Sequence, residues 1–238
     1  MSGILAPRAD VMRKLAELVQ ERRLPWKLRW LKYIRPGRPR ASLRVIGASW
    51  RDSPDLPQLF LHEYGAELVA DTLDACRIVG MKPFLAFGTL LGHYRDHGFI
   101  PHDADIDFGL LQADFTKRDL LELEMQKRGY LTRLNDDREI AFYKPQFPTL
   151  CVDFFVFTRK GDSFVYHDAR GDEEYEFSFP ADVFDDLIPV KFLGRIDAWI
   201  PKGTEQFLEA SYGDWRTPKK DFHNVHDHPN VRVTTRGE

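Results

Sequence analysis

The chain has 238 residues, of which 43% are hydrophobic, and its 37 acidic and 34 Lys or Arg residues give a net charge of −3 at pH 7. This mix predicts a globular protein with a core of ordinary size, and the absence of any run of eighteen apolar residues excludes a transmembrane helix. Residues 1–15 lack the features of a secretory signal, and Cys76 and Cys151 form no CxxC pair, so we expect reduced, buried thiols in a cytoplasmic protein.

The charge is unevenly distributed along the chain. Residues 22–44 hold nine Lys or Arg and no acid, which leaves 25 basic against 37 acidic residues, or −12, elsewhere. We expect residues 1–56 to form a short amphipathic helix over 10–23 followed by a basic arm broken by prolines. The arm either contacts an anionic membrane surface through its aromatic side chains or packs on the domain. Nucleic acid is not favoured, because the body is acidic and the arm contains no recognised module.

Beyond the arm, helical and strand-like patterns are mixed. The expected helices cover 57–78, 89–98, 115–128 and 205–211, and the expected strands cover 82–87, 104–111, 130–134, 139–144, 150–157, 163–168 and 175–179. This order predicts an α/β (α+β) fold, with a mixed sheet flanked by helices over residues 57–218. Residues 219–238 are expected to be a polar tail, and the spacing of His223, His226 and His228 there is only loosely metal-like.

Acidic residues alternate at the start of the strand expected at 104–111. Side chains at i and i+2 share one face of a strand, so Asp103, Asp105 and Asp107 should converge. Asp153 is the one charge in the apolar run CVDFFVF, where a lone carboxylate would be costly to bury. Crowded carboxylates need a cation, so we predict Mg²⁺, or Mn²⁺ in its place, held by these four acids. The alternative is that the acids are solvated edge charges or caps.

Candidate phosphate contacts lie just upstream of the acids. Gly88 and Thr89 follow a strand and open a helix, where free backbone N–H groups and a hydroxyl can bind phosphate. Arg95 can hold two phosphate oxygens at once. The alternatives are a tight turn without a ligand, and an ion pair of Arg95 with Asp96 or the acids. Further along, Tyr212 and Trp215 are expected to pack the C-terminal helix on the sheet, with a stacking role for Trp215 as the alternative.

The stretch FGTLLGHYRDHGFIPHDADIDFGLL resembles the signature of the LicD family, which includes the fukutin-related proteins, in the nucleotidyltransferase-fold superfamily. The superfamily pattern of a Gly-Thr turn, Asp-apolar-Asp and a later acid is matched by Gly88-Thr89, Asp105-Ile106-Asp107 and Asp153. The segment IPKGTEQFLEASYGDWRTP is similar to the end of the family domain. His102 and Ala104 depart from the pattern, which often has Trp and Asp there. The close match covers about residues 83–110, 150–157 and 200–218.

The resemblance implies a metal-dependent transferase. It would move a phospho-alcohol unit, such as phosphocholine or ribitol phosphate, from a CDP-activated donor to a sugar hydroxyl of a cell-surface or lipid-linked glycan, releasing CMP. Asp105 and Asp107 would hold the metal, and Asp153 would complete the metal site or accept the hydroxyl proton. Two alternatives stay open: a nucleotidyltransferase that moves NMP from an NTP to a sugar phosphate or protein, and a non-catalytic glycan-binding module. We expect the protein in the cytoplasm, or peripheral at the inner face of the membrane.

Overall fold

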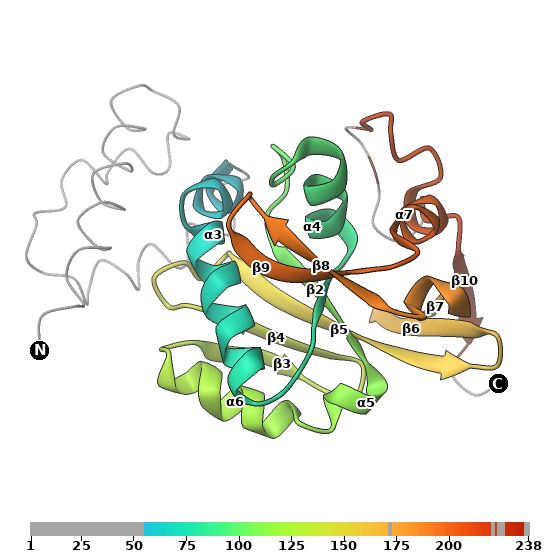
Figure 1. Cartoon of the computed structure of the whole chain (residues 1–238). Helices are drawn as coiled ribbons and strands as arrows, with labels where there is room; N and C mark the ends of the chain where they lie inside the picture. The colour runs from blue at the N-terminus through green and yellow to red at the C-terminus, as the bar shows by residue number, and fades with distance from the viewer. Residues whose placement is uncertain (1–54, 171–172, 220–221, 223–226, 236–238) are drawn as a thin grey trace, which may run out of the picture.

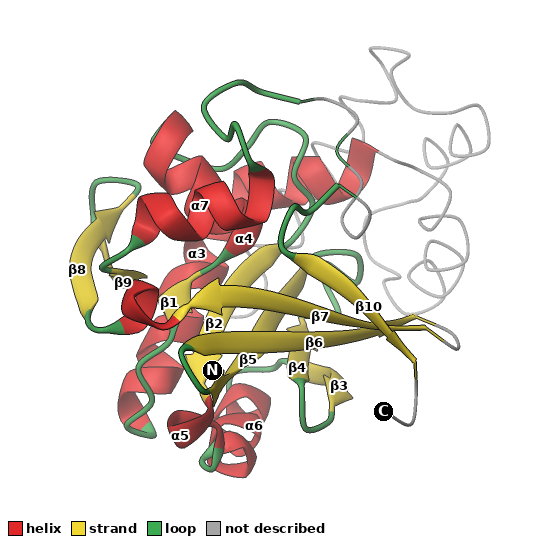
Figure 2. Ribbon diagram, turned by 90° about the vertical axis from the view of Figure 1, so that its right-hand side faces the viewer, coloured by secondary structure: helices red, strands yellow, loops and turns green. Residues whose placement is uncertain are grey.

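The computed structural model describes residues 55–170, 173–219, 222 and 227–235 (Figure 1). The helix expected over 10–23 and the basic arm lie outside these residues. Within them, eight strands form one mixed sheet, and two more form a separate hairpin. Helices α4 (Phe87–Leu91) and α7 (Thr204–Tyr212) lie on one side of the sheet, with α5 (Gln112–Phe115) and α6 (Arg118–Lys127) on the other (Figure 2). The expected mixed α/β fold is confirmed, and none of the described helices is long and apolar enough to cross a membrane.

Helix α3 (Asp55–Ile78) is the long helix predicted from the sequence. Leu61, Leu68 and Cys76 are fully buried on its inner side. Gly80 lies two residues beyond the end of the helix, and its φ of 71° is in the left-handed region. The Met81 N–H donates to the Cys76 carbonyl at 2.8 Å. This is a Schellman-type ending, which explains why a glycine closes the helix.

The metal-site region is built from short elements. They are β1 (Phe84–Leu85), α4 (Phe87–Leu91), the π-helical turn η3 (Gly92–Asp96) and β2 (Ile106–Leu111). The last strand begins two residues later than expected. The reason is a turn in which the Asp103 N–H donates to the Ile100 carbonyl and the Asp103 carboxylate accepts from the Ala104 N–H. Asp103 and Asp105 therefore lie in the loop before the strand.

The five strands expected between residues 130 and 179 are confirmed. They are β3 (Leu131–Asn135), β4 (Glu139–Tyr143), β5 (Cys151–Lys160), β6 (Ser163–Arg170) and β7 (Glu173–Pro180). The main path of the sheet is β1-β2-β5-β6-β7-β10, where β10 covers Val231–Thr235. Strand β4 pairs with β3 and with the first half of β5. The expected helix over 115–128 is divided into α5 (Gln112–Phe115) and α6 (Arg118–Lys127), because the Lys117 backbone between them leaves helical angles.

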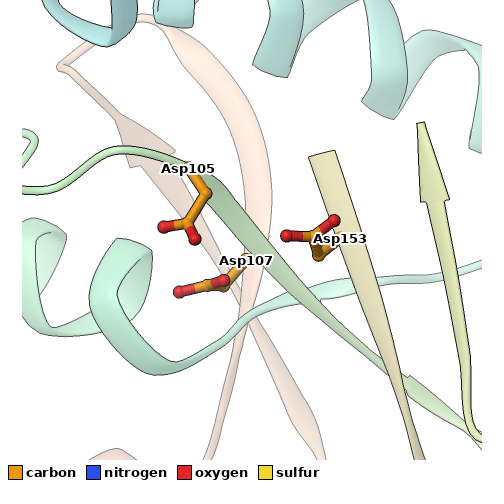
Figure 3. A group of neighbouring side chains, drawn as sticks. All are labelled: Asp105, Asp107 and Asp153. Carbon is orange, nitrogen blue, oxygen red and sulfur yellow. The ribbon is translucent and has the colours of Figure 1, made fainter. Parts of the chain in front are cut away.

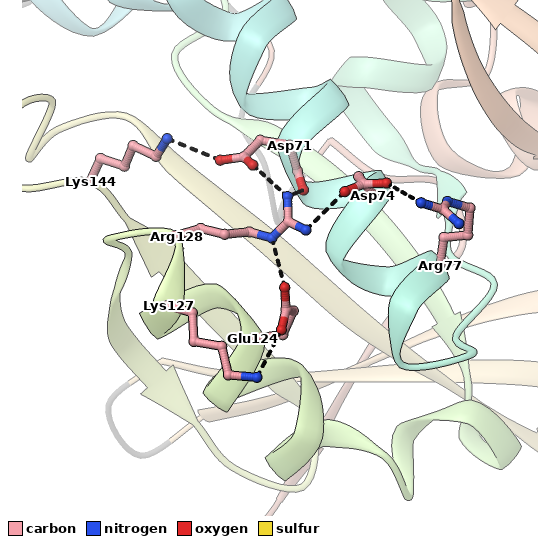
Figure 4. Close-up of polar contacts among 7 residues, drawn as sticks. All are labelled: Asp71, Asp74, Arg77, Glu124, Lys127, Arg128 and Lys144. Carbon is pink, nitrogen blue, oxygen red and sulfur yellow. Dashed lines mark hydrogen bonds and ion pairs between the residues drawn. The ribbon is translucent and has the colours of Figure 1, made fainter. Parts of the chain in front are cut away.

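An ion-pair network joins α3 to α6 (Figure 4). The Arg128 guanidinium donates to Asp71 at 2.7 Å, to Asp74 at 2.8 Å and to Glu124 at 3.1 Å. Lys144, just after β4, donates to the second oxygen of Asp71 at 3.0 Å. These mostly half-buried groups fix the two helices against the C-terminal end of β4.

The C-terminal part contains elements that the sequence patterns did not indicate. These are the 3₁₀ turn η4 (Ala181–Phe184), the hairpin of β8 (Leu187–Phe192) and β9 (Ile196–Pro201), and β10 (Val231–Thr235). The helix expected over 205–211 is present as α7 (Thr204–Tyr212). Strand β10 lies within the segment expected to be a polar tail, and it pairs antiparallel with β7. The division into an arm, a catalytic domain and a tail stays a prediction.

Candidate metal centre

Three of the predicted carboxylates converge at the start of two neighbouring strands (Figure 3). Strands β2 and β5 are parallel, and their register places Asp107 directly opposite Asp153. Asp105 precedes β2, and one carboxylate oxygen from each of the three residues lies within 4.8 Å of the others. The three acids therefore form a compact group of oxygen ligands.

The face of the sheet that carries these acids also carries a cluster of aromatic rings. Phe157, two positions beyond Phe155 and four beyond Asp153 on β5, packs against Phe87 of α4 and Phe207 of α7. Phe87 itself has a φ of 37°, an unusual value for a bulky residue. Its ring, held by the cluster, fixes the turn that leads directly into Gly88.

The Gly-Thr turn holds Asp107 from two sides. The Gly88 N–H donates to the Asp107 carboxylate at 3.0 Å, and the Asp107 N–H donates to the Thr89 hydroxyl at 2.9 Å. Thr89 is fully buried. The two groups that the sequence indicated as phosphate contacts are therefore used within the protein to position a carboxylate.

Glycine is required at position 88 by space. A Cβ there would lie 2.5 Å from the Asp103 Oδ2 and 3.2 Å from the Asp107 Oδ2. The first distance is far below a normal contact, so any larger residue would push the carboxylates apart. The backbone of the turn thus lies against the acids with no room for a side chain.

Burial and mutual repulsion disfavour the ionised forms of these aspartates. Burial raises the pKa of Asp107 well above its usual range, and the charges of Asp105, Asp103 and Asp153 raise it further. Burial and the neighbouring Asp105 raise the pKa of Asp103 to about 8. Burial also raises the pKa values of Asp105 and Asp153.

The donor set fits a divalent cation. The Asp103 Oδ2 is buried and has no hydrogen-bond partner among the described residues. Asp105, Asp107 and Asp153 offer carboxylate oxygens only, which are the ligands that Mg²⁺ and Mn²⁺ prefer. Asp103 is not one of these three residues, although its charge also raises the pKa of Asp107. A cation would relieve the repulsion that raises these pKa values.

A cavity of about 290 Å³ opens beside the acids. Its lining residues come from the metal-site region, from the end of α7 and from the segment after α7: Gly88, Leu91, Arg95, Ile100, His102, Asp103, Ala104, Asp105, Tyr212, Asp214, Trp215, Thr217, Lys219 and Phe222. The cavity therefore joins carboxylates on one wall to cationic and aromatic side chains on the other.

Arg95 lines this cavity but is already engaged. Its Nε and Nη2 donate to the two oxygens of Asp96 at 2.9 and 2.8 Å, and its Nη1 donates to the Trp215 carbonyl at 3.2 Å. The ion pair with Asp96, one of the alternatives raised by the sequence, is thus present. Three of the five guanidinium N–H groups are used, and two are left for a ligand.

The Trp215 side chain is packed against its neighbours, and little of its ring surface is exposed. It is 6% exposed, the Tyr94 ring meets it edge-on at 5.6 Å, and the Arg216 guanidinium lies 4.1 Å from its ring centroid. These contacts agree with the expected packing role. They leave little of the indole free for stacking on a ligand.

Two further groups near the site were missed by sequence reasoning. Glu139 lies on β4 opposite Phe155, diagonal to Asp153, and burial and the charge of Asp168 raise its pKa to about 7. His228, expected in a polar tail, is buried among aromatic rings. Only the strand register could have revealed the position of Glu139, and no local sequence pattern marks His228 as a buried residue.

A mixed sheet with a Gly-Thr turn after one strand, two acids at the start of the next strand and a third acid on the parallel neighbour of that strand defines a nucleotidyltransferase-like domain. Residues 80–203 match the family model described as LicD/FKTN/FKRP, nucleotidyltransferase domain. The match spans more than half of the chain, and the protein belongs to this family.

Several curated proteins are similar to the chain. Ribitol-5-phosphate transferase FKTN of Mus musculus is 29% identical over 174 residues, which cover 70% of this chain and 35% of that protein. The uncharacterized protein T07A5.1 of Caenorhabditis elegans is 28% identical over 187 residues, covering 69% of this chain and 48% of that protein. The uncharacterized protein RT0683 of Rickettsia typhi is 28% identical over 153 residues, covering 63% and 45%. The chain thus spans about half or less of the length of these relatives.

Proposed function

We propose that the protein is a metal-dependent transferase that moves a phospho-alcohol unit from a CDP-activated donor to a sugar hydroxyl. The observation that carries this proposal is the convergence of Asp105, Asp107 and Asp153 beside a cavity that also contains Arg95. Membership of the LicD/FKTN/FKRP family supports it, as does similarity to proteins named ribitol-5-phosphate transferases.

In the proposed reaction the acceptor oxygen attacks the phosphorus that carries the alcohol, the bond from that phosphorus to the CMP oxygen breaks, and CMP leaves. A Mg²⁺ ion bound by Asp105, Asp107 and Asp153 would neutralise charge on the donor phosphates. The two unused N–H groups of Arg95 would contact a phosphate oxygen. Gly88 would let the donor approach the acids closely. The proton of the acceptor hydroxyl would pass to a carboxylate, and Asp153 is the candidate if it is not a metal ligand.

The proposed partners follow from the same site. They are a CDP-alcohol as donor and a glycan or lipid-linked glycan as acceptor. Residues 22–44, for which we propose contact with an anionic membrane, lie outside the described residues. The proposed location at the inner face of the membrane depends on the same residues. The cytoplasmic location stays a prediction; Cys76 and Cys151 are both free and buried, as expected.

The test is a panel of CDP-alcohols incubated with the full chain, Mg²⁺ and candidate glycans, with CMP release and phosphodiester formation followed by ³¹P NMR. Asp105→Asn and Asp107→Asn should abolish CMP release. Asp185→Asn, at an exposed position after η4, is the matched control and should keep it. Transfer of label from CTP or ATP, with no CMP from any CDP-alcohol, would instead establish the nucleotidyltransferase alternative.

A further inference from the structure

A phosphate in the cavity needs hydrogen-bond donors that the protein does not already use. The Gly88 N–H is already engaged with the Asp107 carboxylate. The Thr89 hydroxyl accepts from the Asp107 N–H, is fully buried and does not line the cavity. Arg95 has three of its five donors committed to Asp96 and Trp215, so only two N–H groups remain, and its charge is already paired with Asp96. The contacts expected from the sequence are therefore too few to hold an anion beside several carboxylates.

Tyr212, the last residue of α7, supplies an uncommitted donor on the same wall. It lines the cavity together with Gly88, Asp103 and Asp105. Its hydroxyl has no hydrogen-bond partner among the described residues. A phenol is protonated at neutral pH, so this hydroxyl is available as a donor.

The ring of Tyr212 is held in place by its neighbours. Phe222 lies 5.0 Å and His228 5.5 Å from its centroid. His228 also meets Phe87 at 6.2 Å, so the same cluster holds the residue that leads into the Gly88 turn. Figure 2 shows α7 beside α4, which is the arrangement that brings the two ends of this cluster together.

We propose that Tyr212 is a further catalytic residue, whose hydroxyl donates a hydrogen bond to a phosphate oxygen of the nucleoside diphosphate donor in the cavity. This inference rests on the proposed function. No covalent bond to Tyr212 forms or breaks: the phenol keeps its proton and stabilises phosphate charge as the bond to CMP breaks. Tyr212 lies beyond residues 80–203, the part that matches the family model, and within the segment 200–218 whose sequence resembles the end of the family domain.

The test compares the full chain with Tyr212→Phe, which keeps the ring and removes only the hydroxyl. CDP is titrated calorimetrically in the presence of Mg²⁺, and Mg²⁺ alone is titrated in parallel. We expect the variant to bind CDP about tenfold or more weakly, the loss typical of a hydrogen bond to a charged group, with unchanged Mg²⁺ affinity. Tyr94→Phe is the matched control, because the Tyr94 hydroxyl donates to Glu205 and does not line the cavity.

The outcomes separate this inference from the proposed function. Equal CDP affinity of wild type and Tyr212→Phe would overturn the role of Tyr212 even if CMP release from CDP-alcohols were observed. Failure of the wild type to bind CDP would overturn it as well. Weaker binding by Tyr212→Phe but not by Tyr94→Phe, with no CMP released from any CDP-alcohol, would support the contact and reject the transferase.

Discussion

The buried hydroxyl of Thr89 accepts a hydrogen bond from the backbone amide of Asp107, its neighbour across the turn, at 2.9 Å. Thr89→Val would keep the shape of the side chain but leave that amide unpaired. We expect a loss of about 1–3 kcal/mol in the free energy of unfolding, together with weaker Mg²⁺ binding, because Asp107 loses its anchor. Urea unfolding and calorimetry measure the two effects. Thr89→Ser, which keeps the acceptor, should behave nearly as wild type in Mg²⁺ binding.

A methyl group at position 88 would collide with the Asp103 carboxylate. Gly88→Ala should therefore reduce Mg²⁺ affinity and CMP release at least tenfold, while the circular dichroism spectrum stays native. Gly98→Ala is the control, since a Cβ there would meet only the Leu193 side chain at an ordinary 3.5 Å. Unchanged Mg²⁺ affinity in Gly88→Ala would contradict the close approach of this turn to the acids.

The repulsion among the acids should make the metal-free protein less stable than it could be. Folding raises the pKa of Asp105. The contribution of this carboxyl group to the free energy of unfolding is therefore fully present below its pKa in the unfolded chain, and it is lost as the pH rises through its pKa in the folded protein. At pH 8 in EDTA, Asp105→Asn should therefore raise Tm, by about 2–4 °C for each kcal/mol of repulsion removed. The rise in Tm that Mg²⁺ gives the wild type should disappear in the variant. A lower Tm for the variant in EDTA would refute this reasoning.

Asp153 has two possible roles, and metal binding separates them. If Asp153 is a ligand, Asp153→Asn should weaken Mg²⁺ binding about as much as Asp107→Asn does. If it accepts the proton, the variant should bind Mg²⁺ with little change and lose CMP release. The position of Asp153 opposite Asp107, with its oxygen within 4.8 Å of the other two, favours the first result.

Burial lowers the pKa of His228 to about 4 from an ordinary value of 6.5. Between these two pKa values the unfolded chain binds a proton at His228 that the folded protein does not bind. The contribution of neutral His228 to stability is therefore fully present above pH 6.5 and is lost as the pH falls towards 4. The total effect is about 3 kcal/mol. His228→Phe should fit the aromatic surroundings and remove this dependence, so wild type should lose stability relative to the variant between pH 6.5 and 4. Parallel urea denaturation curves at pH 7 and 4.5 provide the check.

Much of the fold could be predicted because strong local patterns mark α3 and the strands β3 to β7. The hairpin β8–β9 was missed because Pro189 interrupts its first strand and its turn at Leu193 and Gly194 falls between short apolar runs. Strand β10 was missed because its residues are mostly polar, so its pairing with β7 depends on long-range contacts rather than on local sequence.

The acids of the site could be predicted more fully than their surroundings. Asp105, Asp107 and Asp153 stand out because each is a charge next to apolar strand residues. The sequence could not show that the Gly88 amide is already engaged, since a free N–H and a bonded one look the same in a motif. Nor could it place Tyr212 beside residues that precede it by more than a hundred positions.

Strand β10 also has a consequence for where the protein can be cut. The family match ends at residue 203, yet β10 covers the outer edge of β7. A chain that keeps α7 and ends before β10 would leave β7 with a row of unpaired amides and carbonyls, which is a template for pairing with other molecules. The shortened protein would then lose solubility before it lost metal binding or catalysis. Its failure would reflect the exposed edge of β7 rather than a defect in the metal site.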